Sequence, residues 1–187
     1  MIDQFMETNE PLVRVEKLSV SFGSQRVLRD ISLSIPAGQT VALLGESGCG
    51  KTVLMKSIIG LIRPTRGRVF FDDEEIQLLD DQQLSRLRLR FGFVFQHAAL
   101  FDSMTIGQNV AFPLVQHGDF TSQQIHDIVL SRLSEVGLPD SVVTKKPAEL
   151  SGGMQKRVGL ARALIMNPEL IMYDEPCLLY TSDAADE

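Results

Sequence analysis

The chain has 187 residues, of which 44% are apolar and 22% charged, as in an ordinary globular domain with a sizeable core. Its formal net charge of −6 gives no overall field that favours nucleic acid as a partner. No apolar run approaches the roughly 20 residues that span a bilayer. Its two cysteines are too few for a disulfide framework.

Two β-strands are predicted near the start of the chain. Residues 1–11 are polar and are expected to form a flexible lead-in. Alternation over 13–20 predicts the first strand, and the apolar pattern over 27–35 predicts the second. Phe22 directly precedes Gly23, where a turn is expected. Its ring is either ordinary core or surface filler, or an aromatic that stacks on an adenine base.

A glycine-rich stretch of the form G-x-x-x-x-G-K-T follows, Gly45-Glu46-Ser47-Gly48-Cys49-Gly50-Lys51-Thr52. Apolar residues 40–44 before it predict a buried strand, and residues 53–59 after it predict a helix that Gly60 ends. In that context backbone N–H groups face a phosphate, Lys51 reaches the β- and γ-phosphates, and the Thr52 hydroxyl ligates Mg²⁺. The alternative is a glycine-rich turn that binds nothing. Such a turn would not need the strand before it, the helix after it and the Lys51-Thr52 pair. The stretch therefore predicts binding of a nucleoside triphosphate with Mg²⁺.

Gln96 is the next candidate site residue. A turn at 63–67, a short strand at 68–71 and a helix around 80–89 precede a buried strand predicted at 91–95. Ligands in open α/β sheets lie beyond the carboxyl ends of the strands. Gln96 therefore stands where its amide can touch a metal ion or a water.

The region 97–166 changes from strand to helix. Thr121 and Gln124 predict a capping box for one helix, and Ser151 predicts the N-cap of another. Gly152 and Gly153 leave exposed N–H groups at the start of that second helix. They form either a second anion site or a plain helix cap.

Two carboxylates come directly after the apolar strand predicted at 170–173. Asp174 is suited to hold Mg²⁺ through water, and Glu175 to polarise the attacking water. Acidic residues after a strand are often ordinary loop residues. Their presence in the same chain as the glycine-rich stretch favours a hydrolytic site.

In this order, the motifs resemble those of the nucleotide-binding domain of ATP-binding-cassette (ABC) proteins. The matching motifs are the Walker A loop at 45–52, the Q-loop glutamine Gln96, the signature loop at 150–154 and the Walker B strand at 170–175. The resemblance implies an α/β fold, a P-loop NTPase (RecA-like) core with an N-terminal antiparallel β subdomain and an inserted helical subdomain. It also implies that Phe22 stacks on adenine.

The resemblance assigns parts of the chain to two subdomains. The ATP-binding core would comprise 12–96 and 167–176, and the helical subdomain 97–166. Two such domains would pair head to tail as a homodimer. Ser151, Gly152 and Gly153 would then donate to the γ-phosphate of the ATP bound by the second copy, and Gln96 would sense that phosphate.

Met154 stands where the commonest signature has glutamine. With the segment that follows it, and with 95–105 and 109–114, it resembles the branch that powers intermembrane lipid transport through Mce-type proteins. This implies an ATPase peripheral to the cytoplasmic face of the inner membrane, an integral membrane permease and an Mce-domain lipid-binding partner. Leu100, Phe101 and Met104 would either dock a helix of the permease or pack inside the helical subdomain.

Two alternatives differ in function. One is the ATPase of another ABC importer or exporter, against which Met154 and the stretch 101–114 argue. The other is a soluble non-transport ABC protein acting in DNA repair or translation. The acidic charge balance and the lack of a second cassette in this sequence argue against it.

The sequence departs from the family after Pro176, where a D-loop, a further strand and a switch histidine are expected. One back-translation of residues 177–187 resembles a transposase adapter used in preparing sequencing libraries, so we expect this tail to be non-native and the core to be incomplete. We therefore expect the chain as given to hydrolyse essentially no ATP. It keeps residues that bind nucleotide and Mg²⁺.

Overall fold

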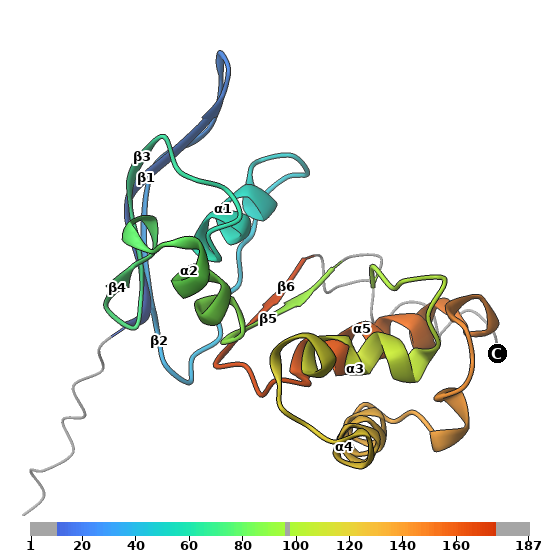
Figure 1. The fold of residues 1–187 in the computed structure, drawn as a ribbon. Coiled ribbons are helices and arrows are strands. Elements are labelled where there is room, and N and C mark those ends of the chain that lie inside the picture. The colour runs from blue at the N-terminus through green and yellow to red at the C-terminus, as the bar shows by residue number, and fades with distance from the viewer. Residues whose placement is uncertain (1–10, 96–97, 175–187) are drawn as a thin grey trace, which may run out of the picture. The chain divides into compact units, whose positions relative to one another are not determined.

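The chain divides between Arg88 and Leu89 into two units in the computed structural model, which describes residues 11–95 and 98–174 (Figure 1). Unit 1 contains β1 (Pro11–Phe22), β2 (Gln25–Pro36), α1 (Lys51–Ile58), β3 (Arg66–Phe71), β4 (Glu74–Glu75), the 3₁₀ helix η1 (Ile76–Leu78) and α2 (Asp81–Arg88). Unit 2 contains β5 (Phe91–Val94), α3 (Ile106–His117), α4 (Ser122–Glu135), the 3₁₀ helices η2 (Asp140–Val142) and η3 (Pro147–Glu149), α5 (Gly152–Leu164) and β6 (Leu170–Tyr173).

Unit 1 is built on an antiparallel sheet with the strand order β2-β1-β3-β4. Strand β1 buries Val13 and Val15, and then Leu18 and Val20. The alternation shifts by one residue where Lys17 adopts a φ of 47° and the register with both neighbouring strands is irregular. This irregularity returns the later apolar residues to the buried face. The two strands predicted at the start of the chain are confirmed.

Helix α1 covers the buried face of that sheet. It buries Leu54, Met55 and Ile58, while β3 contributes Val69 and Phe71 to the same core. Gly60 follows the helix with a φ of 68°, a conformation that glycine adopts without strain. The predicted helix and its glycine end are confirmed.

The buried strand predicted at 40–44 is wrong. These residues have no strand conformation, and the sheets of the described residues include no strand there. Val41 is 45% exposed and Leu44 is 93% exposed. An apolar, partly β-branched segment has the propensity for a strand, but a strand also needs a neighbour that accepts and donates its backbone hydrogen bonds. None of the described strands pairs with this segment.

In unit 2, β5 and β6 pair in parallel, with Phe91 opposite Leu170 and Val94 opposite Tyr173. Both strands were predicted, and β5 ends at Val94, one residue earlier than expected. Strands β5 and β6 both belong to unit 2. The predicted extents of the ATP-binding core (12–96 and 167–176) and of the helical subdomain (97–166) stay predictions.

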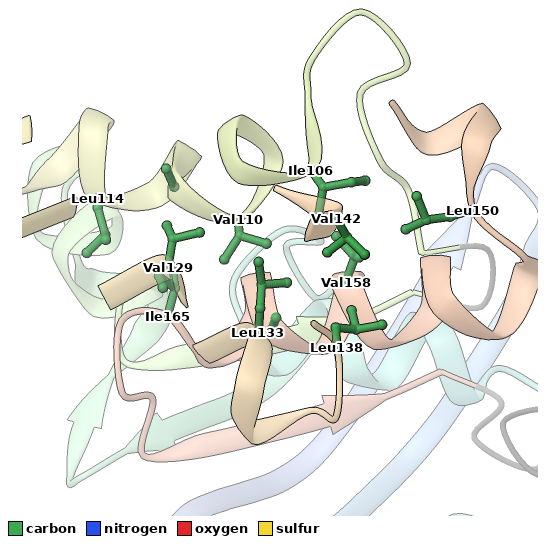
Figure 2. Packing of buried hydrophobic residues seen from close by; sticks show 12 residues of the cluster. Ile106, Val110, Leu114, Val129, Leu133, Leu138, Val142, Leu150, Val158 and Ile165 are labelled. Atoms are coloured by element: carbon green, nitrogen blue, oxygen red, sulfur yellow. The ribbon is translucent and has the colours of Figure 1, made fainter. Parts of the chain in front are cut away.

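The core of unit 2 lies among α3, α4, α5 and the segments that connect them (Figure 2). Ile106, Leu133 and Val158 are fully buried there. Helix α4 begins with the predicted capping box of Thr121 and Gln124, and α3 begins with a second one of Thr105 and Gln108. Within the described ranges, no helix is both long and apolar enough to cross a membrane.

Candidate nucleotide-binding site

The glycine-rich loop places the start of α1 against the sheet of unit 1. Gly50, the N-cap residue, has a φ of 103°. A Cβ atom built there would lie 2.8 Å from Cδ2 of Leu28 on β2. Only glycine satisfies both the left-handed conformation and this close approach. Because glycine has no side chain to cap the helix, the first N–H groups of α1 have no side-chain acceptor at the N-cap.

The Lys51 ammonium lies over the loop that precedes it. Its Nζ donates to the carbonyl oxygens of Gly45 and Glu46, both at 2.8 Å, and lies 3.8 Å from Sγ of Cys49. The loop also closes through a bond from Cys49 N to Glu46 O of 3.3 Å. A full positive charge thus stands beside the positive end of a helix dipole. Phosphate oxygens are stronger acceptors than carbonyl oxygens and are able to replace them.

The residues predicted to hold Mg²⁺ offer the donor atoms that this ion prefers. Thr52 carries its hydroxyl in the first turn of α1, and Asp174 follows β6 directly. Among the described residues, no group of three or more His, Cys, Asp or Glu side chains forms a metal cage. Mg²⁺ in phosphate sites takes one or two protein oxygens and completes its shell with phosphate and water, so the donor set fits.

Phe22 lies at the end of β1 and is 51% exposed. Leu28, which Gly50 contacts, pairs with Val20, two residues before Phe22. The ring therefore belongs to the end of the β1–β2 hairpin against which the glycine-rich loop packs. This position suits a ring that stacks on the base of a nucleotide, and the stacking role stays a prediction.

In unit 2, the start of α5 is held by side chains of its own first turn. Ser151 is the N-cap, as predicted, and its Oγ accepts from Met154 N at 3.3 Å. Gln155 Nε2 donates to Pro147 O at 2.9 Å and to Leu150 O at 3.3 Å. Ser151 and Gly152 are exposed on this fixed loop. Met154 N–H is taken up by this cap, which leaves the N–H groups of Gly152 and Gly153 to meet an anion.

Asp174 lies where two parallel strands end. Its N–H donates to Val94 O at 3.0 Å, which continues the β5–β6 ladder by one bond. Asp174 therefore lies beside the end of the strand that leads to Gln96. Gln96 and Glu175 themselves lie outside the described residues.

The structure thus divides the predicted residues between the two units. Unit 1 holds Phe22 and the loop with Lys51 and Thr52, and unit 2 holds the signature residues and Asp174. Their assembly into one site, and the role of each residue there, stay predictions.

Two polar residues that fix loops of unit 2 were not predicted from the sequence. One is Gln155, whose bonds fix the signature loop. The other is Asn109, which is fully buried and whose amide bonds to the backbone of Phe101 in both directions, at 2.8 and 3.1 Å. A polar residue on the apolar face of a helix could have pointed to Asn109 as a buried hydrogen-bonding residue. Gln155 could have been found from its position four residues after the predicted N-cap, Ser151.

A family model described as ABC transporter matches residues 28–178. The chain belongs to the ABC transporter family. The solved dimeric structure of the ATP-binding cassette MJ0796, in a post-hydrolysis state bound to ADP and Pi, superposes with a TM-score of 0.83 and 33% sequence identity. That superposition covers 91% of this chain and 76% of the MJ0796 chain. The fold is that of an ABC ATPase cassette, as predicted.

Among curated proteins, two relatives bear different names. "Probable ribonucleotide transport ATP-binding protein mkl" of Mycobacterium tuberculosis is 47% identical over 164 residues, which cover 88% of this chain and 45% of the relative. "Intermembrane phospholipid transport system ATP-binding protein MlaF" of Escherichia coli is 40% identical over 165 residues, which cover 88% of this chain and 61% of the relative. The chain thus spans about half the length of the curated relatives it matches.

Proposed function

We propose that the protein containing this chain binds and hydrolyses ATP as the ATPase subunit of an ABC transporter. The observation that carries the proposal is the Lys51 ammonium, held over the glycine-rich loop at the uncapped start of α1. Such an arrangement attracts the β- and γ-phosphates through backbone N–H groups, a helix dipole and one full charge.

Each candidate residue then has a distinct task. Phe22 stacks on adenine, and Lys51 with the loop 45–52 binds the phosphates. Thr52 and Asp174, with the amide of Gln96, would hold Mg²⁺, which when bound neutralises charge that develops on the phosphate oxygens. Glu175 accepts a proton from the water that attacks the γ-phosphorus.

The working unit is a homodimer of nucleotide-binding domains. The exposed start of α5 provides the second half of each site, since Ser151, Gly152 and Gly153 of one copy donate to the γ-phosphate of ATP on the other copy. The dimeric MJ0796 cassette supports this arrangement. Binding of ATP then favours the closed dimer, because only that state offers donors from both copies.

We further propose phospholipid, moved between membranes, as the cargo. The ATPase would sit peripherally at the cytoplasmic face of the inner membrane, with an integral membrane permease and an Mce-domain lipid-binding protein as partners. Met154, with the stretches 95–105 and 109–114, and the phospholipid-transport name of MlaF support this reading.

The higher identity to mkl favours a second candidate cargo, a ribonucleotide. The test is reconstitution of the full-length protein with its permease in vesicles that contain labelled phospholipid, alongside vesicles loaded with labelled ribonucleotide. ATP-dependent movement of the phospholipid alone supports the proposal. Movement of the ribonucleotide alone supports the second candidate, and ATP hydrolysis that moves neither label contradicts both.

A further inference from the structure

The end of the β1–β2 hairpin extends beyond the rest of the sheet in unit 1 (Figure 1). Strand β3 pairs with β1 only as far as Ser19, which lies opposite Arg66. Beyond that point, β2 is the strand neighbour of β1 among the described residues. The register between β1 and β2 also shifts between Val20 and Ser21. Phe22, the predicted adenine-stacking residue, therefore lies where the sheet supports β1 from one side.

The side chain of Thr65 supports the other side of β1 at this point. Its Oγ1 accepts a hydrogen bond from the backbone N–H of Ser21 at 3.0 Å. Ser21 is the residue directly before Phe22. An N–H group beyond the end of a neighbouring strand needs another acceptor, and a hydroxyl oxygen is able to be one. Thr65, which directly precedes β3, thus continues the bonding of β1 past the last residue that β3 pairs with.

The turn that carries Thr65 is itself fixed against β1 by backbone contacts. Thr65 N donates to Ser19 O at 2.8 Å. Gly67 has a φ of 87°, and a Cβ atom there would lie 2.4 Å from Lys17 O. Only glycine allows the turn to approach the strand so closely. Because these contacts do not involve the Thr65 hydroxyl, a substitution that removes the hydroxyl is expected to break the bond to Ser21 and leave the turn in place.

We propose that Thr65 is the positioning residue for Phe22: its hydroxyl holds the backbone directly before the ring and so sets where the ring meets the base of the nucleotide. The inference rests on the proposed function, in which Phe22 stacks on adenine. Stacking depends on the orientation of the two rings as well as on their contact, so a displaced hairpin end binds the base less well. In this role Thr65 acts through Phe22 and contacts neither base nor phosphate.

Two ligands distinguish this role from a general effect on the folding of unit 1. ATP carries a base and three phosphates, whereas inorganic tripolyphosphate carries the phosphates alone. In the proposed site, the loop 45–52 binds the phosphates and Phe22 binds the base. Loss of position at Phe22 should therefore weaken the binding of ATP and leave the binding of tripolyphosphate unchanged. Calorimetric titration of the nucleotide-free, full-length protein measures both affinities.

Thr65→Val keeps the branched shape of the side chain and removes the acceptor. We expect it to weaken ATP binding about 3- to 10-fold, the effect of one neutral hydrogen bond, and Thr65→Ser, which keeps the hydroxyl, to match the wild type. The matched control is Ser32→Ala. Ser32 Oγ accepts from Lys17 N at 2.9 Å, which is the same kind of bond to the same strand, further from Phe22. Ser32→Ala should bind ATP and tripolyphosphate like the wild type.

A double-mutant cycle with Phe22→Ala decides whether Thr65 acts through the ring. The inference predicts that the double variant Phe22→Ala/Thr65→Val binds ATP as Phe22→Ala alone does. If Thr65→Val does not fold, Thr65→Ala takes its place in the cycle.

Four results would each overturn the inference and leave the ATPase proposal standing. They are an unchanged ATP affinity for Thr65→Val, an equal loss of affinity for ATP and tripolyphosphate, an undiminished effect of Thr65→Val in the Phe22→Ala background, and a normal ATP affinity for Phe22→Ala beside a reduced one for Thr65→Val. A wild-type protein that binds neither ATP nor tripolyphosphate contradicts the proposed function itself.

Discussion

Two helices of this chain begin after glycine-containing loops predicted to bind phosphate, and their starts are built differently. At α1 the N-cap is Gly50, which supplies no side-chain acceptor, and Lys51 bonds to carbonyl oxygens of the loop. At α5 the N-cap is Ser151, whose side chain accepts from Met154 N, and Gln155 fixes the loop before it. The loop before α1 is thus bonded by the ammonium of Lys51, whereas the loop before α5 is bonded by the uncharged side chains of Ser151 and Gln155.

This difference matches two different tasks. A loop that envelops the phosphates of its own nucleotide needs its N–H groups uncapped and a cation that exchanges one set of oxygens for another. A loop that meets a phosphate from a second copy gains from being formed beforehand, because less conformational freedom is lost on contact.

The largest effect, loss of ATP hydrolysis, is expected to follow from residues 40–44, the segment that leads into α1. Residues 40–44 are unpaired in the described part of the chain and expose Leu44, so the loop before α1 lacks the support that Gln155 gives to α5. The 187-residue chain by itself should therefore hydrolyse essentially no ATP. Phosphate release is measured beside the full-length protein, and comparable Mg²⁺-dependent turnover in both would contradict the prediction.

Glu175→Gln in the full-length protein tests whether the two helix starts meet on one ATP. The substitution keeps size and hydrogen bonding but removes the base, so turnover should fall by about 10²- to 10⁴-fold. ATP should still bind, and the closed dimer should accumulate in gel filtration with ATP. A variant with wild-type turnover would show that Glu175 is not the base, and a monomer with ATP would argue against the shared site.

Lys51→Ala tests the cation at the start of α1. Loss of a charge-assisted contact to phosphate should weaken ATP binding by about 1.5–3 kcal/mol. Calorimetric titration of wild type and variant measures this difference, with Lys56→Ala, on the same helix, as the control. Equal ATP affinities for Lys51→Ala and the wild type would show that Lys51 does not bind phosphate at the start of α1.

The smallest effect is expected at the cap of α5. Ser151→Ala should lower the free energy of unfolding of the nucleotide-free protein by about 1 kcal/mol, and Ser151→Gly by a few tenths. Both substitutions remove the hydroxyl proposed to contact the γ-phosphate, so both should weaken ATP-driven dimerisation similarly. Denaturant titration and gel filtration give the two readouts. If only Ser151→Ala weakens the dimer, Ser151 is a helix cap and not a phosphate ligand.

Local features of the fold were readable from the sequence alone. The capping box at Thr121, the N-cap at Ser151 and the glycine end of α1 each depend on residues within four positions of one another. The strands β1, β2, β5 and β6 followed from apolar patterns of suitable length. The order of the four family motifs gave the family, which the comparisons confirm.

Features that depend on distant partners required the tertiary structure. The apolar segment 40–44 has strand propensity, but whether it forms a strand depends on a neighbour, which its own residues cannot specify. Likewise, nothing near Arg162 in the sequence shows that its guanidinium binds the carbonyl groups of Ala98 and Ala99, more than sixty residues away. The sequence determined which chemical groups are present and the local geometry of their loops. Only the packing of distant segments decided which backbone groups those side chains hold, because hydrogen-bond partners far apart in the chain leave no periodic or spacing signal.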